Sequence, residues 1–181
     1  MKDAIRLFVA ATLPEALKQE LQEQLQVYNH PSVRPVPHQN LHLTLFFLGN
    51  VPVQQLPDIK QTIREVAQRH QPFVLDFGCT EPGPKPKSPR LIWARFAELL
   101  AFEQLSHDLA QALSAEPPKK QKAIPHVTVA RFKKDKSVPN NLFTITAKEP
   151  LQLHVPAIAL WQSELASPHP VYSVLETYPL G

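Results

Sequence analysis

The sequence predicts an α+β fold with two similar halves around a central cleft. Two observations predict it. A short motif occurs twice, as His42–Leu45 (HLTL) and as His126–Val129 (HVTV), and strand-like and helix-like patterns alternate around each copy in a similar order. No linker-like segment separates the halves. Residues 1–181 are therefore expected to form a single pseudo-symmetric, bilobal domain, with one motif strand from each half at the cleft.

The first half begins with strand, helix and strand patterns. Residues 5–11 form a continuous apolar run that is typical of a buried strand. Thr12 predicts a helix N-cap, and leucines recur every fourth residue up to about Tyr28. Residues 29–40 carry three prolines and no periodicity, which indicates a loop. Residues 41–48 form the first motif strand, and Gly49 should end it.

A second helix is expected from Pro57 to about His70, followed by a strand over 73–77. Residues 78–89, with four prolines, are expected to be a loop. The chain then continues with strand, helix, loop and second motif strand, over residues 91–96, 98–113, 115–124 and 125–132. Four shorter strands are expected over residues 143–146, 151–155, 157–163 and 171–177.

Each motif places a histidine and a threonine on one face of a strand. Residues two apart share a face, so His42 projects with Thr44, and His126 with Thr128. The apolar residues between them face the core. If the two strands lie side by side, two imidazoles and two hydroxyls converge on one small volume.

This set of side chains suits a phosphate. Imidazole titrates near neutral pH, so one histidine can accept a proton while the other donates one to a leaving oxygen. Threonine hydroxyls can hydrogen-bond the non-bridging oxygens, where charge develops. This chemistry requires neither a metal nor a covalent nucleophile.

The paired motifs resemble the 2H phosphoesterase superfamily, which is defined by two H-x-[ST]-x motifs. Within it, the chain is most similar to the bacterial and archaeal RNA 2′,3′-cyclic phosphodiesterases, also called 2′-5′ RNA ligases. The matching stretches extend nearly from end to end and include RLFVA, NLHLTLFFLG, RLIWA and PHVTVAR, at residues 6–10, 40–49, 90–94 and 125–131.

The resemblance implies a bilobal architecture with two antiparallel-type sheets flanking the cleft and helices outside. It implies that His42 protonates the departing ribose O3′, that His126 activates the attacking water, and that a 2′-phosphomonoester results. Thr44 and Thr128 would bind the phosphate. The roles would exchange in the reverse, ligating direction, and spacing alone does not assign acid and base.

Two further residues are candidates for substrate binding. Arg131 matches an arginine that follows the second motif in this branch of the family. Strict alternation from His126 would place it on the opposite face, so a phosphate-binding role requires a bulge or the strand end. Phe46 lies on the His42 face and is a candidate for base stacking, or for the core.

Composition sets broader bounds. The single cysteine, Cys79, excludes an internal disulfide and a cysteine-based zinc cluster. The net charge of +3 indicates a mild attraction to polyanions. No apolar run reaches membrane-spanning length and no signal peptide begins the chain, so a cytoplasmic protein is expected. No nucleotide-binding P-loop occurs, which predicts independence from ATP. We expect a monomer with no cofactor, no metal and no obligate protein partner.

Three groups of basic residues lie in predicted loops and either rim the pocket or only aid solubility. They are Lys85, Lys87 and Arg90; Lys119, Lys120 and Lys122; and Lys133, Lys134 and Lys136.

Alternatives remain open from sequence. The same chemistry could act on a small cyclic nucleotide, an ADP-ribose cyclic phosphate or a 2′-5′ oligoadenylate, or the cleft could bind RNA ends without catalysis. Many relatives have an aromatic residue after the arginine that precedes the first motif, where this chain has Pro35 after Arg34. Residues 167–170 also lack the glycine common before Tyr172. Both departures affect the expected substrate range. The other six histidines have no catalytic or metal-binding spacing and are expected to be exposed or structural.

Overall fold

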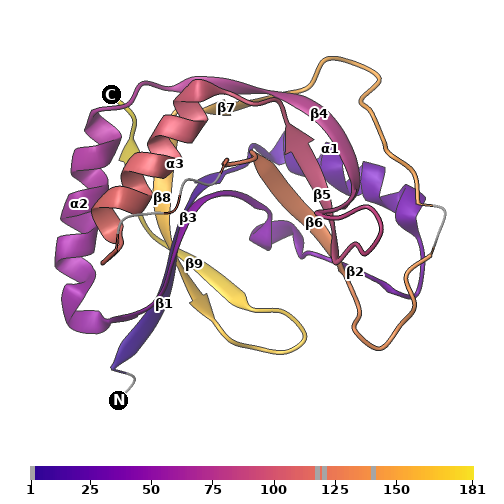
Figure 1. The fold of residues 1–181 in the computed structure, drawn as a ribbon, viewed down its shortest axis with the longest axis horizontal. Coiled ribbons are helices and arrows are strands. Elements are labelled where there is room, and N and C mark those ends of the chain that lie inside the picture. Colours follow the sequence, from indigo (N-terminus) through magenta and orange to yellow (C-terminus); the bar gives the residue numbers. More distant parts are fainter. Residues whose placement is uncertain (1–2, 117–118, 120–121, 140–141) are drawn as a thin grey trace.

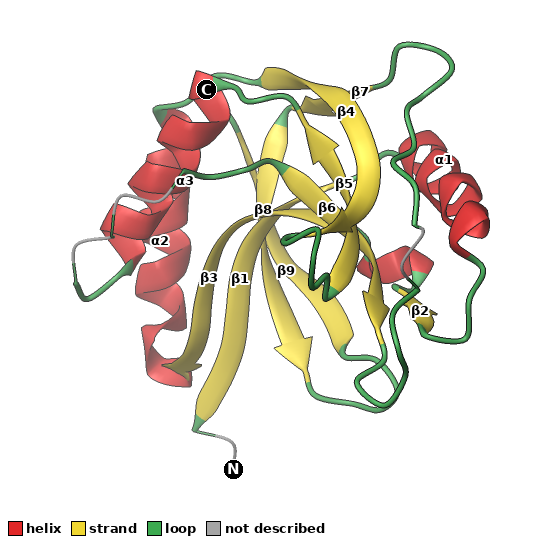
Figure 2. Ribbon diagram, turned by 45° about the vertical axis from the view of Figure 1, so that its right-hand side comes forward, coloured by secondary structure: helices red, strands yellow, loops and turns green. Residues whose placement is uncertain are grey.

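A computed structural model describes residues 3–116, 119, 122–139 and 142–181 of the chain (Figure 1). Within these residues the strands form two antiparallel sheets, with the long helices on their outer sides (Figure 2). The predicted α+β class and the two antiparallel sheets are confirmed.

The four-stranded sheet has the order β3-β1-β8-β9. Its central strand β1 pairs with β3 through Thr12 and His42, and with β8 through Phe8 and Trp161. The first histidine therefore lies at the start of an edge strand. The strands are β1 (Ala4–Thr12), β3 (His42–Pro52), β8 (Ala157–Glu164) and β9 (Val171–Pro179).

The five-stranded sheet has the order β2-β6-β5-β4-β7. The second motif strand is flanked on both sides, because Arg131 lies opposite Arg34 of β2 and opposite Leu91 of β5. The strands are β2 (Val33–Pro35), β4 (Phe73–Gly83), β5 (Leu91–Phe96), β6 (His126–Phe132) and β7 (Gln152–Val155).

Three α-helices cover the outer faces of the sheets. Helices α2 (Leu56–Gln68) and α3 (Leu100–Leu113) pack against each other and against the four-stranded sheet, while α1 (Glu15–Leu25) contacts β6. One continuous hydrophobic core contains side chains from both sheets and all three helices. The two motif strands β3 and β6 come into contact, so the fold brings both histidines to the same region.

The two sheets do not correspond to the two halves of the sequence. Strands β1 and β3 join β8 and β9 from the C-terminal end, and α1 crosses to the other sheet. Each half of the sequence nevertheless supplies one motif strand, β3 from the first half and β6 from the second. Local patterns predict strands, whereas long-range pairing decides which sheet a strand joins.

Several element boundaries also differ from the predictions. Helix α1 begins at Glu15 after Pro14, and no side chain caps it, so Thr12 is the last residue of β1 rather than a helix cap. Strand β3 does not end at Gly49, because this glycine adopts a φ of 76° that lets the strand bend and continue.

Two loop predictions were wrong because tertiary pairing overrides weak local preference. Strand β2 lies in the Pro-rich segment before the first motif and exists through its pairing with β6. Strand β4 continues through the start of the second Pro-rich segment to Gly83, paired with β5. The opposite error occurs over residues 143–146, where a strand was predicted and the structure has only a single bridge between Ile145 and Thr80. No helix in the described part of the chain is long and apolar enough to span a bilayer.

Candidate active site

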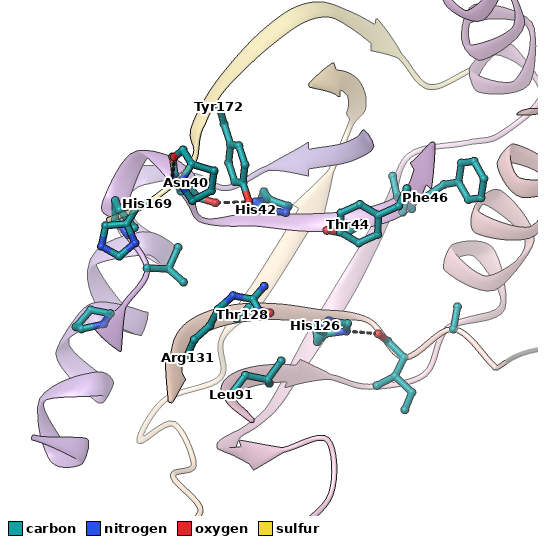
Figure 3. A pocket seen from close by; sticks show the side chains of 18 of the residues that line it. Asn40, His42, Thr44, Phe46, Leu91, His126, Thr128, Arg131, His169 and Tyr172 are labelled. Atoms are coloured by element: carbon teal, nitrogen blue, oxygen red, sulfur yellow. Dashed lines mark hydrogen bonds between the residues drawn. The ribbon is translucent and has the colours of Figure 1, made fainter. Parts of the chain in front are cut away.

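A cleft of about 450 Å³ lies where β3 faces β6 (Figure 3). Both motif histidines, both motif threonines and Arg131 line it, so the five residues predicted to act in catalysis or phosphate binding come together at one site. Aromatic and other apolar side chains form much of its wall, and none of the described residues that line it is an aspartate or glutamate. Its remaining lining residues include Arg34, Asn40, Phe46, Phe47, Leu91, Ile124, His169, Pro170 and Tyr172.

Both histidines are held by the same local hydrogen bond. The Nδ1 atom of His42 lies 2.6 Å from the carbonyl oxygen of Asn40, and that of His126 lies 2.8 Å from the carbonyl oxygen of Ile124. In each case the imidazole donates to the residue two positions earlier. This bond places the neutral tautomer's proton on Nδ1 and leaves Nε2 free to exchange a proton with a ligand.

The surroundings of His42 are aromatic. Its ring centroid lies 4.9 Å from that of Phe8, 5.5 Å from that of Tyr172 and 5.6 Å from that of Trp161. These rings belong to a small hydrophobic cluster on the cleft side of the four-stranded sheet. The Trp161 indole N–H donates to the Ala10 carbonyl oxygen at 3.3 Å, which fixes the ring that lies beside the histidine.

His126 has one aromatic neighbour. The Trp93 ring lies 4.8 Å from its ring, and the Arg95 guanidinium lies 5.8 Å from the Trp93 ring. Gly83 makes room for this tryptophan, because a Cβ atom at position 83 would lie 2.6 Å from Trp93 Nε1. His126 is accordingly the more open of the two imidazoles.

Burial lowers the pKa of both imidazoles. The pKa of His42 falls to about 4, because burial penalises the charged ring and the nearby His126 and Arg131 charges add to the effect. The pKa of His126 is also lowered, to a smaller extent, by burial and by Arg131. The carbonyl hydrogen bonds of Asn40 and Ile124 act in the opposite direction. Both imidazoles are therefore neutral in the free protein at pH 7.

A β-bulge turns Arg131 into the cleft. The register between β5 and β6 shifts where Ala130 pairs with Ile92 and Thr128 pairs with Trp93, which leaves Val129 as the extra residue. The side chains of Val129 and Ala130 are both buried, and Arg131 returns to the face of His126 and Thr128. The bulge that an Arg131 role requires is present.

The aromatic residues after the first motif divide between core and cleft. Phe46 lines the cleft but also packs against the hydrophobic core. The neighbouring Phe47 lines the cleft with 63% of its surface exposed, and its ring lies 5.8 Å from that of Phe8. A register shift at Leu45 places Phe46 opposite Val9 of the core and Phe47 opposite Phe8 of the cleft-side cluster. Simple alternation identifies Phe46 and misses Phe47.

The structure adds cleft residues that lie outside the two motifs. Arg34 comes from β2, and His169, Pro170 and Tyr172 come from the loop and strand after β8. The buried Asn40 side chain donates to the Pro170 carbonyl oxygen at 2.9 Å and so joins the two loops. Both departures from the family pattern, at Arg34-Pro35 and at 167–170, thus lie at the cleft wall. His169 was expected to be structural or exposed, and no sequence pattern distinguishes it.

The basic loop residues lie outside this site. None of the described lysines lines the cleft, and Lys122 pairs with Glu98 at 2.7 Å. Lys120 lies outside the described residues. No group of three or more potential metal ligands (His, Cys, Asp or Glu) occurs within the described ranges.

Comparisons with known proteins agree on one family. The model of the 2′-5′ RNA ligase superfamily matches residues 8–166. An RNA 2′,3′-cyclic phosphodiesterase from Thermus thermophilus is 36% identical over 186 aligned residues, covering 97% of this chain and 90% of the relative. A protein of the same name from Archaeoglobus fulgidus is 29% identical, covering 96% and 99%.

Solved structures show the same fold. The crystal structure of TT0787 from Thermus thermophilus superposes with a TM-score of 0.83 at 31% identity, covering 97% of this chain and 98% of that one. Escherichia coli LigT, complexed with NADP+, superposes with a TM-score of 0.76 at 23% identity, covering 98% of each chain, and shows the likeness of fold alone. The chain belongs to the 2′-5′ RNA ligase superfamily of 2H phosphoesterases.

Proposed function

We propose that this protein is a hydrolase that opens 2′,3′-cyclic phosphate ends of RNA to 2′-phosphomonoesters. The observation that carries the proposal is the pair of inward-facing imidazoles, each fixed through Nδ1 by a backbone carbonyl, in a cleft lined by arginine and threonine without described carboxylates. Such a site attracts an anion and offers it one proton donor and one proton acceptor. Relatives named RNA 2′,3′-cyclic phosphodiesterase support the same substrate class.

In the proposed reaction, Nε2 of His126 takes a proton from water as the water oxygen attacks phosphorus. The bond from phosphorus to O3′ breaks, and the Nε2 proton of the His42 imidazolium moves to O3′. The phosphate remains on O2′ and both histidines have exchanged protonation states. When an RNA 5′-hydroxyl replaces water as the nucleophile, the same ring opening joins the ends through a 2′-5′ bond without ATP.

The hydroxyls of Thr44 and Thr128 and the Arg131 guanidinium hold the non-bridging oxygens in this proposal. All three side chains line the same cleft as the imidazoles. Donors fixed in advance toward developing negative charge stabilise the transition state most. Phe46, together with the more exposed ring of Phe47, is proposed to stack on the terminal base.

The assignment of His42 as acid and His126 as base follows the family resemblance, and it requires bound substrate to reverse the order of proton affinities that the free protein has. The aromatic enclosure makes the His42 imidazolium the stronger acid, and the more open His126 is the stronger base. The free protein holds His42 neutral at pH 7. The negative charge of the bound cyclic phosphate raises the pKa of His42, so that the imidazole takes up from solvent the proton that the acid role requires.

We propose further that the chain acts as a monomer on RNA in the cytoplasm, with no obligate protein partner. A single domain with two lobes is supported by the hydrophobic core that both sheets share.

The direct test uses an RNA oligonucleotide that ends in a 2′,3′-cyclic phosphate, with EDTA and without ATP. Mass spectrometry and phosphatase sensitivity identify the end group. Conversion to a 2′-phosphate is expected. A 3′-phosphate product would reverse the proposed regiochemistry, and cleavage of small cyclic nucleotides alone would transfer the same chemistry to another substrate. An absence of turnover on both would leave an RNA-end-binding protein.

A further inference from the structure

Two arginines lie directly opposite each other at one end of the cleft. Arg34 of β2 and Arg131 of β6 are cross-strand partners, so their side chains project from the same face of the five-stranded sheet, and both line the cleft. Cβ atoms in such pairs are about 5 Å apart, and like charges at this position repel each other. The arrangement is unfavourable for the empty protein.

No described carboxylate balances this pair. The ion pairs of the described residues involve other cations, and neither guanidinium is within 4.0 Å of an acidic oxygen. The protein contact of Arg34 is a 3.4 Å hydrogen bond to the Pro168 carbonyl oxygen, which leaves most of its donors free. An anion between the two guanidinium groups would relieve the repulsion.

The position along β6 places Arg131 at the edge of the reacting centre and Arg34 beyond it. His126, Thr128 and Arg131 follow one another on the cleft face, and a strand advances about 3.3 Å per residue. Arg131 thus lies beyond Thr128, and Arg34 lies one strand farther from the histidines, since β2 flanks β6 at the edge of the sheet.

We infer that Arg34 binds a second phosphate, the phosphodiester on the 5′ side of the nucleoside that carries the cyclic phosphate, and that Arg131 lies between the two phosphates and donates to both. This inference rests on the proposed function and deepens it. The preferred substrate is an oligoribonucleotide with at least one internal phosphate, and a mononucleotide 2′,3′-cyclic phosphate leaves the second position empty. Arginine suits this role because its planar fork can bind phosphate through two hydrogen bonds.

The test compares two dinucleotides that end in a 2′,3′-cyclic phosphate and have the same bases. One has a normal phosphodiester, and the other has a neutral methylphosphonate linkage. The wild-type protein should have a kcat/KM about tenfold higher for the charged linkage, as expected for one charge-assisted contact. Arg34→Gln should reduce this ratio to within about twofold of one, and Arg34→Lys should retain part of it.

Arg69→Gln is the charge-matched control, because Arg69 is exposed at the end of α2, outside the cleft, and the substitution should leave the ratio unchanged. A wild-type ratio near one, or a ratio that Arg34→Gln does not alter, would overturn the inference. An equal loss on both linkages would also overturn it, because Arg34 would then act only as a tether for the loop at Pro168.

Binding separates this inference from the proposed function. Dissociation constants of the corresponding dinucleotides with a terminal 2′-phosphate give the same ratio without turnover. If the protein hydrolysed neither cyclic substrate but retained an Arg34-dependent preference in binding, the proposed function would fail while the second phosphate position would stand. If neither turnover nor binding favoured the charged linkage, only the second phosphate position would be rejected.

Discussion

The two sides of the cleft carry the same motif in different surroundings. His42 and His126 each donate from Nδ1 to the carbonyl oxygen two residues earlier, so the local chain fixes the same tautomer twice. Around His42 the fold adds three aromatic rings, whereas His126 contacts one. The pKa of His42 falls to about 4 and that of His126 falls less.

This difference shows how two identical residues become suited to opposite tasks. The motif supplies orientation, and the packing around it adjusts proton affinity. Acid–base catalysis needs both properties, because the donor must carry a proton and the acceptor must lack one when the bond to phosphorus breaks. Four predictions test the comparison.

The largest effect should follow removal of either imidazole. We expect His42→Ala and His126→Ala each to lower kcat at least about thousandfold, since the two groups transfer protons in one step. RNA-end affinity should stay within a few fold, and the double variant should be little slower than either single one. His154→Ala is the control, because this histidine is exposed on β7 and lies outside the cleft. Turnover that survives either cleft substitution would contradict the catalytic assignment.

The second prediction concerns stability and acid. The folded protein keeps His42 neutral down to about pH 4, while the unfolded chain binds a proton below its ordinary pKa of about 6.5. The free energy of unfolding should therefore fall as pH decreases, by about 2 kcal/mol from this group between about pH 7 and pH 5. In denaturant titrations, the free energy of unfolding of His42→Asn should lack this pH-dependent loss. His126→Asn should remove less, and an equal change in both variants would show that the two sides are alike.

The third prediction concerns the loop contact behind His42. Asn40→Ala removes the hydrogen bond to Pro170 and leaves the backbone carbonyl that orients the imidazole. We expect kcat to fall about tenfold through misplacement of the donor. The acid limb of the kcat/KM profile should move toward about pH 6.5 as the enclosure opens. Gln39→Ala, at an exposed neighbouring position, should have neither effect, and an unchanged pH profile in Asn40→Ala would mean that this contact is only structural.

The smallest expected effect is a displacement of pH optima. The profile of kcat/KM reports groups in the free enzyme, and both imidazole pKa values are lowered there, so its maximum should lie below about pH 6.5. Bound cyclic phosphate raises the pKa of His42, so the kcat maximum should lie about one pH unit higher. Profiles that coincide would argue against proton uptake on substrate binding.

The site residues could be predicted where they lie two residues apart on one face of a strand. The spacing of His42 with Thr44, and of His126 with Thr128, places each pair on one face, and the structure brings all four to one cleft. Arg131 required knowledge of a bulge, because alternation alone directs it to the other face. The exposed Phe47 was missed for the same reason, since irregular register between β1 and β3 has no local sequence mark.

Contacts between distant segments were beyond the reach of the sequence. Nothing near Arg34 indicates a strand opposite Arg131, and nothing near Pro170 indicates that the loop accepts a bond from Asn40. Both contacts join segments that are far apart in the sequence. Many other pairings of these segments would satisfy the same local pattern.

The sequence by itself determined most of the strands and helices, the two histidine–threonine faces and the family, because these depend on residues that are close along the chain. Only the tertiary structure decided which strands share a sheet, how far each imidazole is enclosed and which arginines face each other. Those properties depend on burial and register between segments that are far apart in sequence. They set the proton affinity of His42 and the charge at the end of the cleft.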